Sequence, residues 1–158
     1  GFDIAGPELN YLPSMYKDSF LKVKNEGINI TIHAGEGDGV HSIQEALDNG
    51  AKRIGHGVRI IEDISDDNEL GPTADYILQN NIPLEVCITS NLHTNMYKNP
   101  QDHPISRLHN LGFNISLNTD NRLMSNTSID NELNVAKAAG IEDPTSLLKY
   151  SASDSFLN

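Results

Sequence analysis

Ile28-Asn29-Ile30-Thr31-Ile32-His33 alternates apolar and polar residues, the pattern of a β-strand with two unlike faces. Residues 113–120 repeat the alternation and end in Asp120. Strands of an open parallel sheet, covered by helices on both faces, are apolar almost throughout. Two-faced strands therefore favour a barrel, with the isoleucines toward an outer layer of helices and the polar residues toward the interior.

Strand-like and helical segments alternate along the whole chain. The expected strands cover residues 2–5, 28–33, 53–56, 84–88 and 113–119, and the expected helices 13–25, 40–47, 73–79, 104–110, 128–139 and 145–157. Such alternation predicts an α/β fold with a parallel sheet and helical crossovers. Two architectures fit, an open doubly wound sheet or part of a (β/α)8 barrel, because only five of the eight strands of a barrel are expected here.

The composition is that of one acidic domain. The chain has 158 residues, and 22 Asp and Glu against 11 Lys and Arg give a formal net charge of −11. Nucleic acids and anionic membranes attract basic surfaces, so we expect neither as a partner. A single cysteine, Cys87, excludes an internal disulfide and suits a reducing compartment, so we expect a cytoplasmic protein. No long apolar run occurs, so we expect no membrane span and no signal peptide.

Three potential metal ligands, His33, His56 and Asp120, stand at the ends of three different expected strands. Ligands of parallel α/β folds bind at the carboxyl ends of the strands, so these side chains can converge there. Histidine and aspartate suit zinc or a similar divalent ion. Glu36 follows His33 by three residues, past a glycine, where its carboxyl group can act as a general acid beside the metal.

Each of these residues also has a purely structural explanation. A histidine at a strand end is commonly a hydrogen-bonded structural residue, and Asp120 is followed by Asn121, which is typical of a turn or a helix cap. The glycine-rich residues 35–39 lack the Lys and Ser/Thr of a phosphate-binding loop, so no phosphate site is predicted. The other histidines are interpreted as surface or supporting residues: His41, His93, His103 and His109.

Four motifs resemble those of the adenosine deaminase family and follow one another in that family's order. They read Thr31-Ile32-His33-Ala34-Gly35-Glu36, Arg53-Ile54-Gly55-His56-Gly57, Leu84-Glu85-Val86-Cys87-Ile88-Thr89-Ser90-Asn91 and Ser116-Leu117-Asn118-Thr119-Asp120. Residues 1–8 resemble the family's fourth barrel strand, so the resemblance covers essentially the whole chain. Gly55 favours adenosine deaminases over the related adenine deaminases, which typically have an aspartate at that place.

The resemblance implies a (β/α)8 barrel with one catalytic zinc ion, of which residues 1–158 carry about five βα units. By motif position, it implies His33 and Asp120 as zinc ligands and Gly6 and Asn121 as substrate contacts. It implies Glu36 as the proton donor to purine N1 and His56 as the residue that orients or deprotonates the water. The implied reaction is hydrolytic deamination of adenosine or 2'-deoxyadenosine, a small purine nucleoside, with release of ammonia in purine salvage. Nothing in the resemblance predicts the oligomeric state.

Two departures from the family pattern qualify these expectations. The His-x-His pair that supplies two further zinc ligands does not occur in the 158 residues, so we expect a piece of a longer barrel that is inactive alone. Asn121 stands where many members have a second aspartate. Two alternatives remain: a deaminase of another aminopurine, such as adenine or a modified nucleoside, and a non-catalytic purine-binding paralogue.

Overall fold

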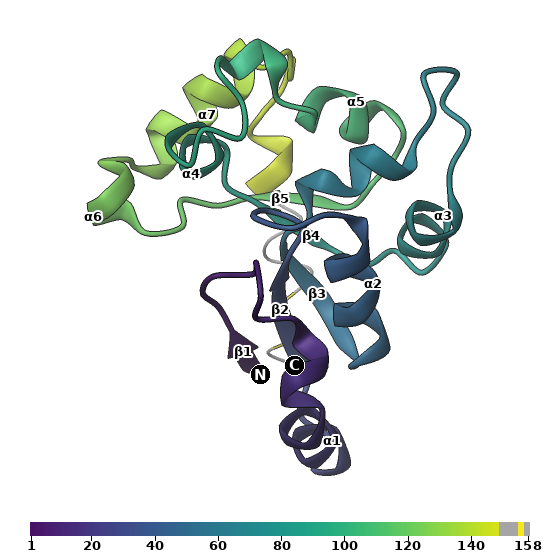
Figure 1. The fold of residues 1–158 in the computed structure, drawn as a ribbon. Coiled ribbons are helices and arrows are strands. Elements are labelled where there is room, and N and C mark those ends of the chain that lie inside the picture. Colours follow the sequence, from purple (N-terminus) through teal and green to yellow (C-terminus); the bar gives the residue numbers. More distant parts are fainter. Residues whose placement is uncertain (149–154, 157–158) are drawn as a thin grey trace.

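The sheet consists of five parallel strands whose order in space is their order in the sequence. The structure, a computed structural model, describes residues 1–148 and 155–156. The strands are β1 (Phe2–Ile4), β2 (Ile30–Ala34), β3 (Ala51–His56), β4 (Leu84–Val86) and β5 (Ile115–Leu117) (Figure 1). A doubly wound sheet reverses its strand order at a switch point, whereas a barrel is wound in one direction. The unbroken order therefore confirms the prediction of a partial (β/α) barrel.

Helices connect the strands and cover one face of the sheet. They are η1 (Pro13–Tyr16), α1 (Lys17–Asn25), α2 (Val40–Asp48), η2 (Val58–Asp63), α3 (Pro72–Gln79), α4 (Ile88–His93), η3 (Pro100–Asp102), α5 (Ile105–Asn110), α6 (Arg122–Ser125) and α7 (Ile129–Ala138). Helix α2 packs against β2 and β3, and α7 packs against β5 and α4 (Figure 1). Within the described residues, no helix has the length and apolar character needed to cross a membrane.

The core lies between the apolar strand faces and the helices. Ile30, Ile32, Ile54 and Ile115 from the strands are fully buried together with Ile43 of α2. Burial of one such side chain contributes about 1.5–3 kcal/mol to folding. The expected two-faced strand is present, because Thr31 and His33 occupy the opposite face of β2, where the guanidinium of Arg53 donates a hydrogen bond to the Thr31 hydroxyl at 3.1 Å.

Several expected boundaries differ from the structure. Strand β5 ends at Leu117, so Asp120 lies in the loop beyond the strand and not at its last position. The chain leaves β4 at Val86 and enters α4 at Ile88, where a strand was expected to continue. Ile88 is fully buried and Leu92 packs against the core one helical turn later, so apolar packing with helical spacing favours the helix. The helix expected over residues 145–157 falls largely outside the described residues.

Candidate active site

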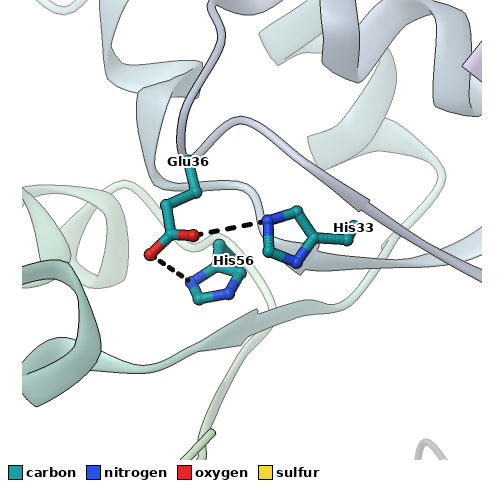
Figure 2. Close-up of side chains that lie close together, drawn as sticks. All are labelled: His33, Glu36 and His56. Atoms are coloured by element: carbon teal, nitrogen blue, oxygen red, sulfur yellow. Dashed lines mark ion pairs between the residues drawn. The ribbon is translucent and has the colours of Figure 1, made fainter. Parts of the chain in front are cut away.

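The structure brings His33, Glu36 and His56 together at the carboxyl ends of β2 and β3. His33 lies in β2, His56 is the last residue of β3, and Glu36 lies in the loop after β2. One Glu36 oxygen is 3.4 Å from His33 Nε2, and the other is 3.5 Å from His56 Nδ1 (Figure 2). The convergence expected for parallel strand ends is therefore present for these three residues.

Asp120 lies on the other side of His56. Its Oδ2 is 3.9 Å from His56 Nε2 and accepts a hydrogen bond of 2.7 Å from the hydroxyl of Ser90. A cavity of about 200 Å³ is lined by His33, Gly55, His56 and Asp120 among others. His56 and Asp120 both have positive φ angles, 63° and 52°. Left-handed backbone at non-glycine residues costs about 1–3 kcal/mol and concentrates at functional sites.

Glu8 is a site residue that the motifs do not assign. Its buried carboxylate accepts four hydrogen bonds from the loop that follows β2 and one from the first turn of α2. The donors are the backbone N–H groups of Gly35, Glu36, Gly37 and Asp38 and the hydroxyl of Ser42, at 2.7 to 3.2 Å. Successive N–H groups of a glycine-rich loop form an anion-binding concavity. The glycine-rich run therefore does hold an anion, but the anion is a carboxylate of the same chain and not a phosphate.

The electrostatics of the cluster favour a cation. Burial alone would raise the pKa of Glu8, but hydrogen bonds with His33 and with the Glu36 backbone lower it to about 2. Burial would lower the pKa of His33, but hydrogen bonds with Glu36 and Glu8 raise it to about 9. Burial alone would raise the pKa of Glu36, but its hydrogen bonds with His33 and Asn91 and the nearby charges of the two histidines together lower it. Two carboxylates therefore face one imidazole, and burial lowers the pKa of His56 so that its ring is neutral.

The residues present fit a divalent metal of the zinc type. His33, Glu36 and His56 each offer one ligand atom, and these atoms lie within 4.8 Å of one another. Imidazole nitrogen and carboxylate oxygen are zinc ligands, and catalytic zinc sites combine three protein ligands with a water molecule. Asp120, on the wall of the same cavity as His33, adds a further carboxylate.

The two predicted substrate contacts lie in different surroundings. Gly6 lines a cavity of about 250 Å³ that His33 and Glu8 also reach, and its φ of +137° belongs to a region that favours glycine. The Asn121 side chain instead accepts a hydrogen bond of 3.1 Å from the N–H of Met124 and caps α6. Binding of substrate by either residue stays a prediction.

Two buried polar residues, Asn91 and His103, support the cluster. The Asn91 amide contacts Glu36 and His56, and His103 contacts Asn91. Asn91 is fully buried in α4, and His103 is 3% exposed. Motif position alone gives no role to Asn91, and His103 was interpreted only as a surface or supporting residue. The sequence places His103 just before a proline and the apolar helix α5, which marks the start of a helix. It does not reveal the spatial contact of His103 with Asn91.

Fold and site together define a class, that of (β/α)-barrel proteins with a histidine and carboxylate cluster at the strand ends. Residues 1–155 match the family model described as adenosine deaminase. The chain belongs to the adenosine deaminase family. Adenosine deaminase 1 of Streptomyces coelicolor is 48% identical over 137 residues, which are 84% of this chain and 35% of that relative.

Solved structures agree with the assignment of the fold. An adenine deaminase from Arthrobacter aurescens superposes with a TM-score of 0.88 at 24% identity, over 100% of this chain and 47% of that one. An amidohydrolase from Burkholderia ambifaria with bound zinc superposes with a TM-score of 0.86 at 18% identity, over 99% of this chain and 43% of that one. The chain thus spans less than half of the proteins that it matches.

Proposed function

We propose that the intact gene product containing this chain deaminates adenosine and 2'-deoxyadenosine hydrolytically, as an enzyme of purine salvage. Water adds at C6 of the purine, the amino group leaves as ammonia, and inosine or 2'-deoxyinosine remains. The observation that carries the proposal is the convergence of Glu36 with His33 and His56, with Asp120 beside them, in a member of the adenosine deaminase family.

His33 and Asp120 would hold a zinc ion in this proposal. When bound, zinc supplies Lewis acidity that lowers the pKa of a water molecule to near neutrality. His56, whose ring is neutral because burial lowers its pKa, orients or deprotonates that water. Support for a metal comes from the donor chemistry of the cluster and from the zinc in the Burkholderia ambifaria amidohydrolase.

Glu36 moves the proton that makes C6 electrophilic. Its lowered pKa keeps the carboxyl group ionised until a proton arrives from the attacking water, after which it protonates purine N1. The hydrogen bond of 2.9 Å from the Asn91 amide holds one of its oxygens in place. Replacement of Glu36 by glutamine removes the transferable proton and preserves the size of the side chain.

Gly55 supports adenosine over adenine as the substrate, because the related adenine deaminases typically have an aspartate at this motif position. A Cβ at this position would lie 3.2 Å from the Cα of His33, so any side chain here presses on the strand that carries a proposed zinc ligand. Both residues line the cavity between His56 and Asp120. The identity of 48% over 137 residues with an adenosine deaminase points the same way.

A substrate panel tests the proposal. The zinc-loaded intact gene product is incubated with adenosine, 2'-deoxyadenosine, adenine and AMP, and ammonia release is measured for the wild type and for Glu36→Gln. We expect turnover of the two nucleosides and a loss of about 10²–10⁴-fold in the variant. Preference for adenine or AMP would support the other aminopurine deaminases, and purine binding without turnover would support the paralogue. We further propose a cytoplasmic protein, consistent with its single cysteine.

A further inference from the structure

A chain of hydrogen bonds runs from the backbone of α5 to the catalytic cluster through His103 and Asn91. Buried polar groups are costly unless they are hydrogen-bonded, so the partners of these two residues define their states. His103 accepts a hydrogen bond of 3.2 Å at Nδ1 from the N–H of Ile105. A backbone N–H can only donate, so Nδ1 of His103 carries no proton.

The protonation of His103 follows from this contact. Because Nδ1 carries no proton, the proton of the ring lies on Nε2, and burial lowers the pKa of His103 to about 3, which keeps the ring neutral. That Nε2–H donates to Oδ1 of Asn91 at 3.2 Å. The acceptor end of the Asn91 amide is thereby assigned, although the two ends of an amide are alike in size.

The orientation of Asn91 determines the state of His56. With Oδ1 toward His103, the Asn91 Nδ2 group donates to Glu36 at 2.9 Å and to Nδ1 of His56 at 3.1 Å. Since Nδ1 of His56 accepts, the proton of the neutral ring lies on Nε2, the nitrogen 3.9 Å from Asp120. His56 and Asp120 both line the cavity in which the proposed metal and water would sit.

We propose that His103 and Asn91 are positioning residues that hold His56 as an Nε2–H donor and hold Glu36 in reach of the substrate. His103 acts only through Asn91. This inference rests on the proposed deaminase function and decides between two roles of His56, because a ring whose Nε2 already carries a proton orients the water by donating to it and does not deprotonate it. The aromatic contact of His103 with Tyr97, at 4.9 Å between ring centroids, would by itself explain a structural role only.

Two substitutions at residue 103 separate positioning from packing. His103→Gln places an amide nitrogen where Nε2 was and keeps the donor to Asn91. His103→Asn reaches only the former position of Nδ1 and loses that donor. In the zinc-loaded intact gene product, we expect His103→Gln to keep kcat within about threefold and His103→Asn to lose about 10–100-fold in kcat with little change in KM.

A spectroscopic readout separates failure of this inference from failure of the proposed function. ¹⁵N NMR of labelled histidine reports which nitrogen of His56 carries the proton, without any turnover. We expect the Nε2–H form in the wild type and in His103→Gln, and a mixture of both forms in His103→Asn. An unchanged His56 spectrum in folded His103→Asn, or equal kcat in the two variants, would overturn the proposal.

A second variant keeps the test decisive where His103→Asn does not fold. Asn91→Asp preserves the size of the side chain and the acceptor for His103 but loses the donor to Glu36 and His56. We expect Asn91→Asp to lose kcat at least as strongly as His103→Asn and to release His56 from its single protonated form. Wild-type kcat together with an unchanged His56 spectrum in Asn91→Asp would refute the inference.

Discussion

Replacement of Glu8 by glutamine tests the carboxylate that organises the loop after β2. In the structure its two oxygens accept four hydrogen bonds from that loop and one from Ser42 of α2. Glutamine keeps one acceptor oxygen and turns an NH₂ group toward the remaining donors. If the amide oxygen takes the place of Oε2, the N–H groups of Glu36 and Gly37 lose their acceptor.

The magnitude follows from the number of donors left without a partner. A buried donor that loses its acceptor costs about 1–3 kcal/mol, and because these two N–H groups are only partly buried the lower limit applies, about 2 kcal/mol for both. Because every 1.4 kcal/mol corresponds to a tenfold change in an equilibrium constant, the lower limit predicts a roughly 30-fold faster amide exchange in the loop. The same change lowers the free energy of unfolding where the loop and the core unfold together.

Hydrogen exchange of the intact gene product measures this effect residue by residue. We expect the amides of residues 35–38 to be protected in the wild type and to exchange at least about 30-fold faster in Glu8→Gln. Glu45→Gln is the matched control, because Glu45 accepts a single exposed N–H, that of Ser14. Protection of residues 35–38 that is equal in Glu8→Gln and Glu45→Gln would refute the role assigned to Glu8.

Three further predictions concern the site. Gly55→Asp should lower kcat/KM for adenosine by more than tenfold while Gly55→Ala lowers it less, since both press on His33 but only aspartate adds a charge; steady-state kinetics that rank the two variants in the opposite order would contradict this. Asp120→Asn should weaken zinc binding by at least the roughly 10–100-fold that loss of a residue supporting a ligand costs, as measured in a competitive chelator titration, with zinc restoring activity to the chelated wild type; unchanged affinity would remove Asp120 from the ligand set. The pKa of His103, about 3 in the folded chain because of burial against an ordinary 6.5, means that the unfolded chain takes up the proton first as the pH falls. The free energy of unfolding should therefore fall below pH 6.5, by about 2 kcal/mol between pH 7 and pH 5. In urea unfolding, His103→Gln should lack this part of the loss. An equal pH dependence of the unfolding free energy in both proteins would contradict the prediction.

The fold was predictable because its signals are local and repeat along the chain. Alternating strand and helix segments predicted the parallel sheet, and the two-faced stretch at Ile30 to His33 favoured a barrel, as the strand order confirms. Strand ends were less predictable. The expected strand at residues 84–88 gives way to α4, a helix that packs against α6 and α7 from later in the chain, and such distant contacts leave no local sequence pattern.

The site was predictable only as far as the strand ends determine it. His33, Glu36 and His56 meet because each lies within two residues of the end of a strand, a position that the sequence marks. Glu8 and His103 reach the cluster through contacts with residues 12 or more positions away, Gly35 and Asn91 respectively. No local pattern marks such a partner, so the sequence of the glycine-rich loop argues against a phosphate site but gives no sign of the carboxylate that its N–H groups bind.

Oxygen-isotope labelling tests the central claim most directly. The zinc-loaded intact gene product converts adenosine in water enriched in ¹⁸O, and the nucleoside product is analysed by mass spectrometry while ammonia is measured in parallel. Hydrolytic deamination predicts inosine with one ¹⁸O atom at C6 for every ammonia released. Adenosine recovered unchanged from protein that has bound both zinc and the nucleoside would contradict the account.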